Sequence, residues 1–400
     1  MISFECALAR IRQAAVTLGT EPVTLRAACD RVLAQDVLAD TNVPPFDKSA
    51  MDGYACRRAD LHKPLRVITT IHAGTVPTVR RIGPGQCVKI MTGALVPPGA
   101  DCVIMREFVR VLADHTIQFT GRATAPNICR AGEDIRKGAL VLRAGTLLKA
   151  PHIATLAMLG CTRPRVYRRA RVGILATGSE LVPPGHTIHG AAIRDSNSHQ
   201  LMAQVAAVGA VPRHYGIVKD IENKMVARIR TALRACDLLL ITGGVSVGDL
   251  DLVPDILKAL GFTLVCETVA MKPGKPMLFG THANGNFCCG LPGNPVSTFV
   301  AFELLLKPFL YRLMGHDYRP PVIKATLGAR LQRKNTGRRE AIPVTFTEAG
   351  TVVPVEYHSS AHISALCLAD GLVFFPVGVS ALKKGALVAV HLLGALHPPA

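Results

Sequence analysis

A glycine loop followed by carboxylates is the stretch of this sequence best suited to hold an anion together with a cation. The apolar run Leu238–Ile241 predicts a short buried strand, which ends in a turn that contains Gly243 and Gly244. Glycines let the backbone turn sharply or approach a ligand closely. Asp249 and Asp251 follow where the next helix is predicted to begin, and unpaired N–H groups at such a junction attract anions. The alternative is a tight turn with an aspartate that caps the helix.

A pair of lysines forms a second candidate anion site. Lys272 and Lys275 stand three residues apart in a turn that Pro273 and Pro276 restrict. A lysine ammonium forms charge-assisted hydrogen bonds with phosphate or another oxyanion, each worth roughly 1.5–3 kcal/mol. A turn exposed to solvent is the alternative for either lysine.

Four carboxylates in polar loops are candidates for a magnesium site. Asp52, Glu180, Asp220 and Asp249 supply the hard oxygen ligands that Mg²⁺ takes alongside water and substrate phosphates. Any one of them alone could instead be a helix cap or a surface charge. The histidines form no cluster with zinc-ligand spacing, and no P-loop or dinucleotide-binding glycine fingerprint is present.

Alternating strands and helices predict how these residues are brought together. Such a pattern is typical of a doubly wound, mostly parallel sheet, in which ligands bind beyond the carboxyl ends of the strands. The predicted strands are 171–176, 215–218, 238–241, 263–269 and 286–290. The predicted helices are 197–208, with Asn197 as a candidate cap, 221–234, 252–260 and a long helix from Pro295. Each polar, glycine-bearing loop follows a strand. We therefore expect these loops to gather at one edge of the sheet.

The flanking regions carry a different pattern. Short β-like runs separated by Gly and Pro over about 55–142 predict a small all-β module, and similar runs over 319–400 predict a β-barrel or sandwich. A helix over 3–19, capped by Ser3, and a second one near 150–160 are also predicted.

Composition narrows the class of protein. At 400 residues, the chain is long enough for two to four domains. Its 12 cysteines are scattered without a CxxC pair, which indicates reduced thiols in a cytoplasmic protein. No apolar run reaches the roughly 18–20 residues that span a bilayer. The most apolar candidate, Ser297–Leu310, contains Glu303 and Lys307 and predicts a buried helix with one ion pair.

The net charge of +18 favours an anionic partner. A nucleic acid is one alternative, but little aromatic stacking potential and no RNA-binding signature accompany the basic clusters. We therefore expect an anionic small molecule rather than a nucleic acid. The alternative for most of the surplus charge is an arginine bias shared by the whole proteome. The clustered residues are Arg163, Arg165, Arg168, Arg169, Arg171, Arg330, Lys334, Arg338 and Arg339.

Taken together and in order, these motifs resemble the molybdopterin molybdenumtransferase family, which includes the bacterial MoeA proteins and the E domain of gephyrin. The resemblance is carried by PPFDKSAMDGYA (44–55), MTGA (91–94), GEDI (132–135), TGSEL (177–181), the Asp195/Asn197 segment, TGGVSVGDLD (242–251), MKPGKP (271–276), GLPGNPVS (290–297) and GRRE (337–340).

The resemblance implies four domains. They are an elongated, discontinuous N-terminal domain (1–45 and 143–168), an inserted β domain (46–142), an α/β molybdopterin-binding domain (169–318) and a C-terminal β-barrel (319–400). It also implies a cytoplasmic homodimer that transfers molybdenum from molybdate into adenylylated molybdopterin and releases AMP with Mg²⁺ present. The resemblance further implies two kinds of protein partner: the upstream adenylyltransferase and the downstream molybdoenzymes.

The resemblance also assigns residues to roles. Asp52, Thr92, Glu180, Asp220 and Asp249 would form the catalytic set, with Glu180 and Asp249 as metal ligands. Asp251 then remains as the helix cap. The residues implied in ligand binding are Thr177, Gly178, Ser179, Gly243, Gly244, Ser246, Lys272, Lys275, Pro292, Asn294, Arg338 and Ser360.

Two other functions fit part of the pattern. A molybdopterin adenylyltransferase would share the α/β domain but has no need of the extra β modules or the Asp52 loop. A non-enzymatic scaffold like gephyrin would have no need of Glu180, Asp249 and the two lysines.

Overall fold

The computed structural model describes residues 1–245 and 252–394. The chain divides into two compact units. The first comprises Met1–Ala34, Gly145–Leu148 and the chain from Arg165 onward, and the second comprises Gln35–Ala144 and Lys149–Pro164. Ser246, Asp249 and Asp251 lie outside the described residues, so their assigned roles stay predictions.

A six-stranded sheet forms the centre of the first unit, with the strand order β16-β13-β17-β21-β20-β18. The strands are β13 (Arg171–Thr177), β16 (Val211–Val218), β17 (Leu238–Thr242), β18 (Thr263–Thr268), β20 (Pro276–Thr281) and β21 (Phe287–Leu291). Neighbouring strands among β16, β13, β17 and β21 are parallel, whereas β20 is antiparallel to both of its neighbours. The mostly parallel sheet predicted from the sequence is confirmed.

Strand β20 was missed by the sequence prediction, which placed only a loop between the strands at 263–269 and 286–290. Met277, Leu278 and Phe279 of β20 are buried, and β20 forms a hairpin with β21. Because β20 reverses direction, β18 runs the same way as the parallel strands. The lysine turn that follows β18 therefore still lies at the carboxyl edge of the sheet.

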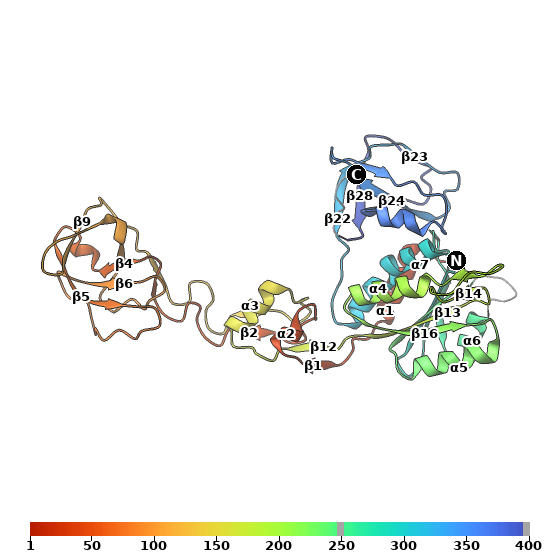
Figure 1. The fold of residues 1–400 in the computed structure, drawn as a ribbon, viewed down its shortest axis with the longest axis horizontal. Coiled ribbons are helices and arrows are strands. Elements are labelled where there is room, and N and C mark those ends of the chain that lie inside the picture. Colours follow the sequence, from red (N-terminus) through yellow and green to blue (C-terminus); the bar gives the residue numbers. More distant parts are fainter. Residues whose placement is uncertain (246–251, 395–400) are drawn as a thin grey trace. The chain divides into compact units, whose positions relative to one another are not determined.

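Helices cover both faces of this sheet (Figure 1). One face carries α1 (Phe4–Ala14), α4 (Asn197–Ala207) and α7 (Pro295–Ala301), and the other carries α5 (Glu222–Leu233) and α6 (Val253–Ala259). Successive side chains of β17 pack on opposite faces of the sheet. Leu238 and Leu240 belong to the first core cluster, and Leu239 and Ile241 belong to the second. This alternation is the period of two that a strand imposes.

The first helix is shorter than predicted. Its cap is as expected, because the Ser3 hydroxyl oxygen accepts the N–H of Cys6 at 3.1 Å. However, α1 ends at Ala14 rather than near Gly19, since Ala15 takes an extended conformation with ψ of 121°.

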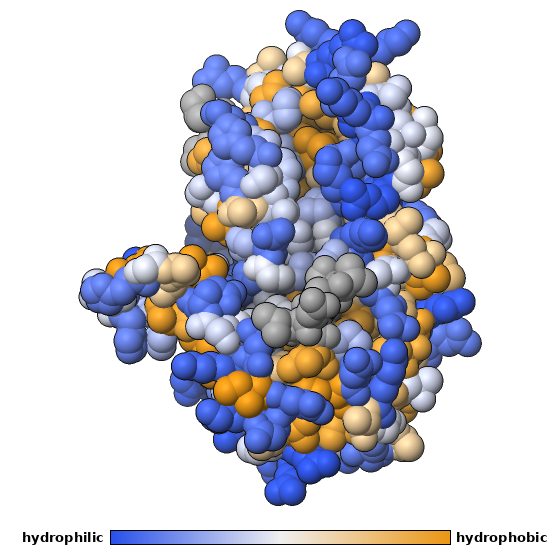
Figure 2. All heavy atoms as spheres, turned by 90° about the vertical axis from the view of Figure 1, so that its right-hand side faces the viewer, coloured by the Kyte–Doolittle hydropathy of each residue, from blue (hydrophilic) through white to orange (hydrophobic). Residues whose placement is uncertain are grey.

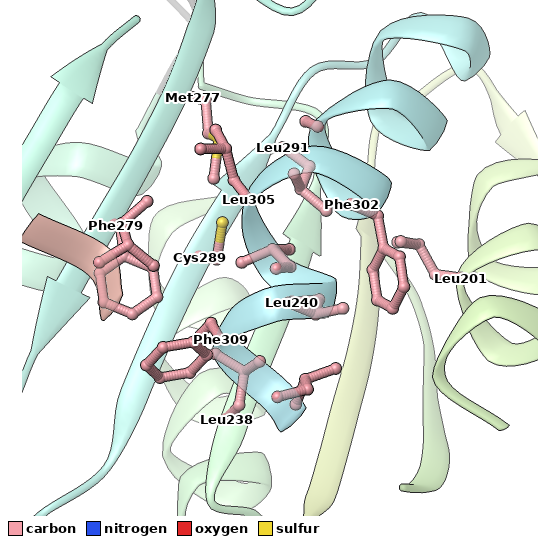
Figure 3. Packing of buried hydrophobic residues seen from close by; sticks show 14 of the residues in the cluster. Leu201, Leu238, Leu240, Met277, Phe279, Cys289, Leu291, Phe302, Leu305 and Phe309 are labelled. Atoms are coloured by element: carbon pink, nitrogen blue, oxygen red, sulfur yellow. The ribbon is translucent and has the colours of Figure 1, made fainter. Parts of the chain in front are cut away.

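The larger core packs between the sheet and the helices after β21 (Figure 3). Phe309 meets the rings of Phe279 and Phe287 edge-on, at centroid distances of 5.0 Å each. The predicted long helix is α7, a π-helical turn η3 (Phe302–Leu306) and α8 (Lys307–Leu313). Lys307 Nζ lies 2.8 Å from Glu303 Oε2, which confirms the predicted ion pair. None of the helices within 1–245 and 252–394 is both long and apolar enough to cross a membrane.

A second six-stranded sheet follows, and one of its strands comes from the lysine turn. β19 (Met271–Lys272) pairs in parallel with β24 (Arg339–Phe346). The turn is thus tied to the C-terminal sheet by backbone hydrogen bonds. The other strands are β22 (Val322–Thr326), β25 (Val352–Pro354), β26 (Gly371–Phe375) and β28 (Leu387–Leu392); β23 (Leu331–Gln332), β27 (Ala381–Leu382) and the 3₁₀ helix η4 (Ile363–Leu368) complete this part.

Smaller elements complete the first unit. The ribbon of β14 (Leu181–Val182) and β15 (Ile193–Arg194) is parallel, and β1 (Thr20–Pro22) pairs with β12 (Arg165–Tyr167) beside the short helix α2 (Leu25–Ala28).

The second unit is built on a sheet with the order β7-β4-β6-β5-β9-β8. Its strands are β4 (Gly53–Cys56), β5 (Leu65–Ile71), β6 (Gln86–Ile90), β7 (Cys102–Met105), β8 (Val109–Val111) and β9 (Thr116–Phe119). Two further ribbons pair β3 (Lys48–Ser49) with β10 (Ile128–Cys129) and β2 (Val37–Leu38) with β11 (Leu140–Leu142). Its helices are α3 (Ala150–Met158) and the 3₁₀ turns η1 (Arg58–Asp60) and η2 (Arg106–Phe108).

The face in Figure 2 is not uniformly polar. Hydrophilic residues predominate in its upper part, which belongs to the C-terminal sheet, and hydrophobic residues gather in the lower half, where Figure 1 places α5 and α6.

Candidate active site

A pocket of about 490 Å³ opens at the carboxyl edge of the α/β sheet. Three loops line it, each directly after a parallel strand, together with the β15 segment, Asp220, Pro276 and Ala361. The loop residues are Thr177, Gly178 and Glu180 after β13, Gly243, Gly244 and Val245 after β17, and Pro292, Gly293, Asn294 and Pro295 after β21. The prediction that these loops lie together at one edge of the sheet is confirmed.

Glycine is required where two of these loops meet. Gly243 has φ of +93°, and a Cβ there would lie 2.4 Å from the carbonyl oxygen of Thr177. Gly244 also has positive φ, and a Cβ there would lie 3.0 Å from the Thr177 hydroxyl. The two glycines thus let the β17 loop press against the β13 loop.

Two of the predicted carboxylates reach this pocket. Asp220 Oδ2 accepts the Ser179 N–H at 3.0 Å and faces the Ser179 hydroxyl at 3.4 Å. The Glu180 carboxylate lies over Gly178, where a Cβ would come within 2.8 Å of both oxygens. Oxygen donors of this type suit Mg²⁺ together with substrate phosphate. Across the described ranges, no cluster of three or more His, Cys, Asp or Glu residues forms a ready metal cage.

The predicted residues Asp52 and Thr92 form a pair in the second unit. The Thr92 N–H and hydroxyl both donate to Asp52 Oδ1, each at 2.7 Å. These hydrogen bonds, the backbone one first, hold the pKa of Asp52 below its usual value. Gly53 is needed beside them because a Cβ would lie 1.9 Å from the Ile104 carbonyl oxygen.

The two lysines differ in their surroundings. Lys272 Nζ lies 2.7 Å from the buried carboxylate of Glu340, its neighbour across β19 and β24. Arg333 lies 3.5 Å from the same carboxylate. Lys275 is exposed, and it forms no ion pair within the described part of the chain. One lysine is thus anchored, and the other remains available to an anion.

The two candidates from the C-terminal region make mainly backbone contacts. The Ser360 carbonyl accepts the Val296 N–H at 3.0 Å, at the start of α7, and the next residue, Ala361, lines the pocket. Arg338 is half-buried, and its carbonyl accepts a hydrogen bond from Arg333 Nη1 at 2.6 Å. Ser360 therefore belongs to a segment that borders the pocket.

Several pocket residues were absent from the predicted set. Arg194, Asp195 and Asn197 line the pocket, although the segment that contains them was recognised as a motif. Asn197 was expected to cap its helix, but Ser196 is at the cap position and Asp195 Oδ1 accepts the Ser198 N–H at 3.0 Å. The available signal was the run of polar residues after β15, which the sequence analysis assigned to a family motif and a helix cap but not to the site itself.

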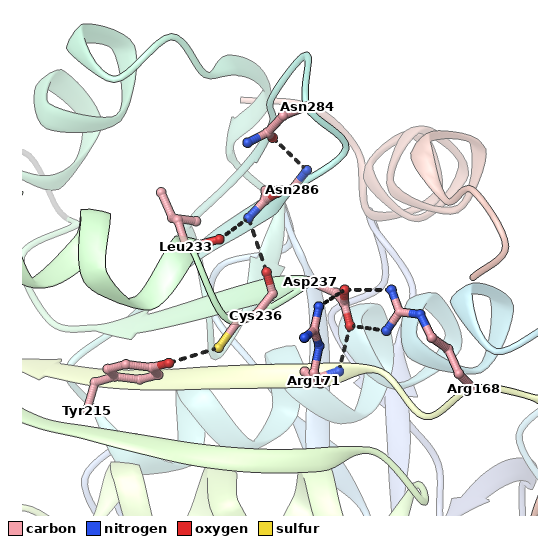
Figure 4. A network of polar contacts seen from close by, with 8 residues as sticks. All are labelled: Arg168, Arg171, Tyr215, Leu233, Cys236, Asp237, Asn284 and Asn286. Carbon is pink, nitrogen blue, oxygen red and sulfur yellow. Dashed lines mark hydrogen bonds and ion pairs between the residues drawn. The ribbon is translucent and has the colours of Figure 1, made fainter. Parts of the chain in front are cut away.

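The amino edge of the same sheet holds a different polar group (Figure 4). Arg168 donates twice to the Asp237 carboxylate, at 2.8 Å each, and the Arg171 N–H donates a third bond at 2.8 Å. Burial would raise the pKa of Asp237, but the bonds from Arg168 and Arg171 outweigh it and hold that pKa below its usual value. Two arginines of the basic cluster, Arg168 and Arg171, therefore neutralise the buried carboxylate of Asp237.

The whole chain is similar to known families of molybdenum cofactor biosynthesis. Residues 2–160 match the MoeA N-terminal region (domain I and II). Residues 173–312 match a probable molybdopterin binding domain, and residues 324–393 match the MoeA C-terminal region (domain IV). The pocket loops after β13, β17 and β21 all fall within the middle match.

Individual relatives extend this likeness over the full length. The molybdopterin molybdenumtransferase of Bacillus subtilis is 35% identical over 388 residues, covering 94% of this chain and 90% of the relative. That of Haemophilus influenzae is 37% identical over 323 residues, or 80% of this chain and 79% of the relative. A crystal structure of the molybdopterin biosynthesis MoeA protein of Pyrococcus horikoshii has a TM-score of 0.85 at 30% identity, covering 98% and 100% of the two chains.

The doubly wound sheet, its carboxyl-edge pocket and the order of the matched regions define the class: a multidomain MoeA-type protein of molybdopterin biosynthesis. More narrowly, the chain belongs to the molybdopterin molybdenumtransferase family.

Proposed function

We propose that this protein inserts molybdenum from molybdate into adenylylated molybdopterin and releases AMP. One observation carries the proposal beyond family membership. A pocket at the carboxyl edge of the sheet combines glycine-bearing loops with the carboxylates of Glu180 and Asp220. Backbone N–H groups in such loops favour phosphate, and carboxylates beside them favour a cation that accompanies it.

The metal in this proposal is Mg²⁺, held by Glu180 and Asp249. Two carboxylates with water and phosphate oxygens make up the coordination that Mg²⁺ prefers. When bound, it would neutralise charge on the phosphoanhydride that is cleaved. Asp220 keeps the β13 loop in place through Ser179, and the hydrogen bonds from Thr92 hold the pKa of Asp52 below its usual value.

The anionic ends of the substrates are assigned to the lysine turn and its neighbours. Lys275 is exposed, and Lys272 is fixed in direction by Glu340. Ser246, Arg338 and Ser360 are the further contacts that we assign to molybdate or to the pterin phosphate. Molybdate and phosphate are both oxyanions, so one set of donors suits either.

The assembly and location are part of the same proposal. We assign a homodimer in the cytoplasm, which receives adenylylated molybdopterin from an upstream adenylyltransferase and supplies downstream molybdoenzymes. The twelve cysteines are all free thiols, as a reducing compartment would require.

Molybdate-dependent AMP release tests the proposal. Purified protein is incubated with adenylylated molybdopterin, Mg²⁺ and molybdate, and AMP and active cofactor are followed in time. We expect AMP release that requires molybdate, with sulfate as the matched inactive oxyanion. AMP release that ignores molybdate, or none at all, would contradict the proposal. Formation of adenylylated molybdopterin from ATP would instead identify an adenylyltransferase, and binding without turnover a scaffold.

A further inference from the structure

The side-chain amide of Asn197 joins two of the pocket loops. Its Nδ2 group donates to the Thr242 hydroxyl oxygen and to the Gly293 carbonyl, each at 2.8 Å. Thr242 belongs to the end of β17 and Gly293 to the loop after β21. Asn197 is only 8% exposed, so these bonds lie in a place where water does not compete for them.

Two further hydrogen bonds connect this group to helix α7. The Thr242 hydroxyl, which is also buried, donates to the Pro292 carbonyl at 3.2 Å. The Thr298 hydroxyl donates to the same carbonyl at 2.5 Å from the first turn of α7. Asn197, Thr242 and the loop after β21 are thus one connected polar group in the pocket wall.

We propose that Asn197 is a positioning residue for the pocket: its amide fixes the spacing between the β17 and β21 loops and so shapes the space that receives the pterin substrate. This inference rests on the proposed function, because the pterin is the ligand that function requires. Asn197 acts through Thr242 and Gly293, which line the pocket with it. Loss of the amide would release two loops that the ligand must contact together.

Gln204, on the same helix, is a matched control. Its Nε2 group donates to the Phe299 carbonyl at 3.4 Å and to Glu303 Oε1 at 2.9 Å, and the residue is 7% exposed. Like Asn197, it is a buried amide that joins α4 to the segment after β21. It does not line the pocket. The two residues therefore share a structural role and differ in their position relative to the ligand.

The experiment compares Asn197→Ala and Gln204→Ala in the full chain. Binding of adenylylated molybdopterin gives Kd, steady-state AMP release gives KM and kcat, and thermal unfolding gives Tm. We expect both variants to lose Tm, but only Asn197→Ala to raise Kd and KM, by about tenfold, which is the effect of losing one or two buried hydrogen bonds. Its kcat should change by less than about twofold. Equal effects of the two variants on Kd would overturn the inference.

Thr242 provides a second, independent variant pair. Thr242→Ser keeps the hydroxyl and should retain the wild-type Kd, whereas Thr242→Val should weaken binding about as much as Asn197→Ala. In the double variant Asn197→Ala/Thr242→Val, the losses should not add, since the two residues share one bond. Additive losses would contradict the inference. If Asn197→Ala does not fold, the Thr242 pair decides alone.

The outcomes separate this inference from the proposed function. If the wild-type protein binds adenylylated molybdopterin but releases no AMP with molybdate, the proposed function fails while the Kd values still test Asn197. If the wild-type protein does not bind adenylylated molybdopterin, both are overturned.

Discussion

The carboxylate at the amino edge of the α/β sheet is paired with arginines, whereas the carboxylates at the carboxyl edge have no such partners within the described ranges. At the amino edge, Asp237 receives hydrogen bonds from Arg168 and Arg171 and is 9% exposed. At the carboxyl edge, Glu180 lines an open pocket and forms no ion pair within the described ranges. Asp220 there accepts only hydrogen bonds from Ser179 among the residues described.

The protein itself neutralises the carboxylate at the amino edge but not those at the carboxyl edge. A buried carboxylate must be paired, because an unpaired charge away from water is costly. A carboxylate left at the mouth of a pocket can instead interact with a ligand. The amino edge is therefore structural, and in the proposed function a substrate and its metal would complete the pairing at the carboxyl edge.

Glu180→Gln should have the largest effect on activity. The amide removes the charge that would hold Mg²⁺ but keeps the shape of the side chain. We expect kcat/KM for molybdate-dependent AMP release to fall by at least about a hundredfold, or roughly 3 kcal/mol of transition-state stabilisation. Tm should be nearly unchanged, because no buried ion pair is broken. A large loss of Tm with activity retained would make Glu180 a structural residue.

Asp237→Asn should give the reverse pattern. It leaves Arg168 and Arg171 without a counter-charge, but both arginines are partly exposed, so water screens the loss. We expect the free energy of unfolding to drop by about 2 kcal/mol. Activity per folded molecule should stay within about twofold of wild type. Urea unfolding and AMP release measure the two quantities. A loss of activity without a loss of stability would contradict the structural role of Asp237.

Acid should remove the stability that Asp237 contributes. The folded-state pKa of Asp237 is lowered from its usual value of 3.8, so its contribution is present above that pH and is lost as pH falls through the folded pKa. The difference in unfolding free energy between wild type and Asp237→Asn should thus be constant above about pH 5 and shrink below about pH 4. A difference that does not shrink at all as the pH falls below about 4 would contradict this origin.

In the second unit, Thr92→Val should change the pKa of Asp52 by only a small amount. The valine keeps the backbone N–H bond to Asp52 but removes the hydroxyl bond. The pKa of Asp52 should therefore rise only part of the way to its usual value, because the backbone bond is the larger cause of its lowering. Carboxyl chemical shifts of Asp52 across a pH series would measure this. Thr92→Ser, which keeps the hydroxyl, is the control and should not shift.

Much of the α/β part was predictable from the sequence because its signals are local. Apolar runs followed by glycine loops marked β13, β17 and β21, and the rule for parallel sheets placed their loops at one edge. Strand β20 was missed, since its short apolar run lies among prolines and glycines that indicate a turn. Helix α1 ended early through the conformation of Ala15, which no local pattern signals.

The site was less predictable because its key contacts join distant residues. Resemblance to a family, not spacing, selected Thr92 and grouped it with Asp52, which is 40 positions away. The partner of Lys272 is Glu340, and this contact follows from a strand pairing between β19 and β24 that the sequence does not reveal. Asn197 was read as a cap, since a polar residue at a helix start usually is one.

Hydrogen–deuterium exchange with adenylylated molybdopterin tests most directly whether the carboxyl edge is the functional one. We predict slower exchange in the three loops after β13, β17 and β21, which line the pocket, when the ligand and Mg²⁺ are added. Exchange at the amino edge, around Arg171 and Asp237, should not change. Protection at the amino edge with the pocket loops unaffected would contradict the account.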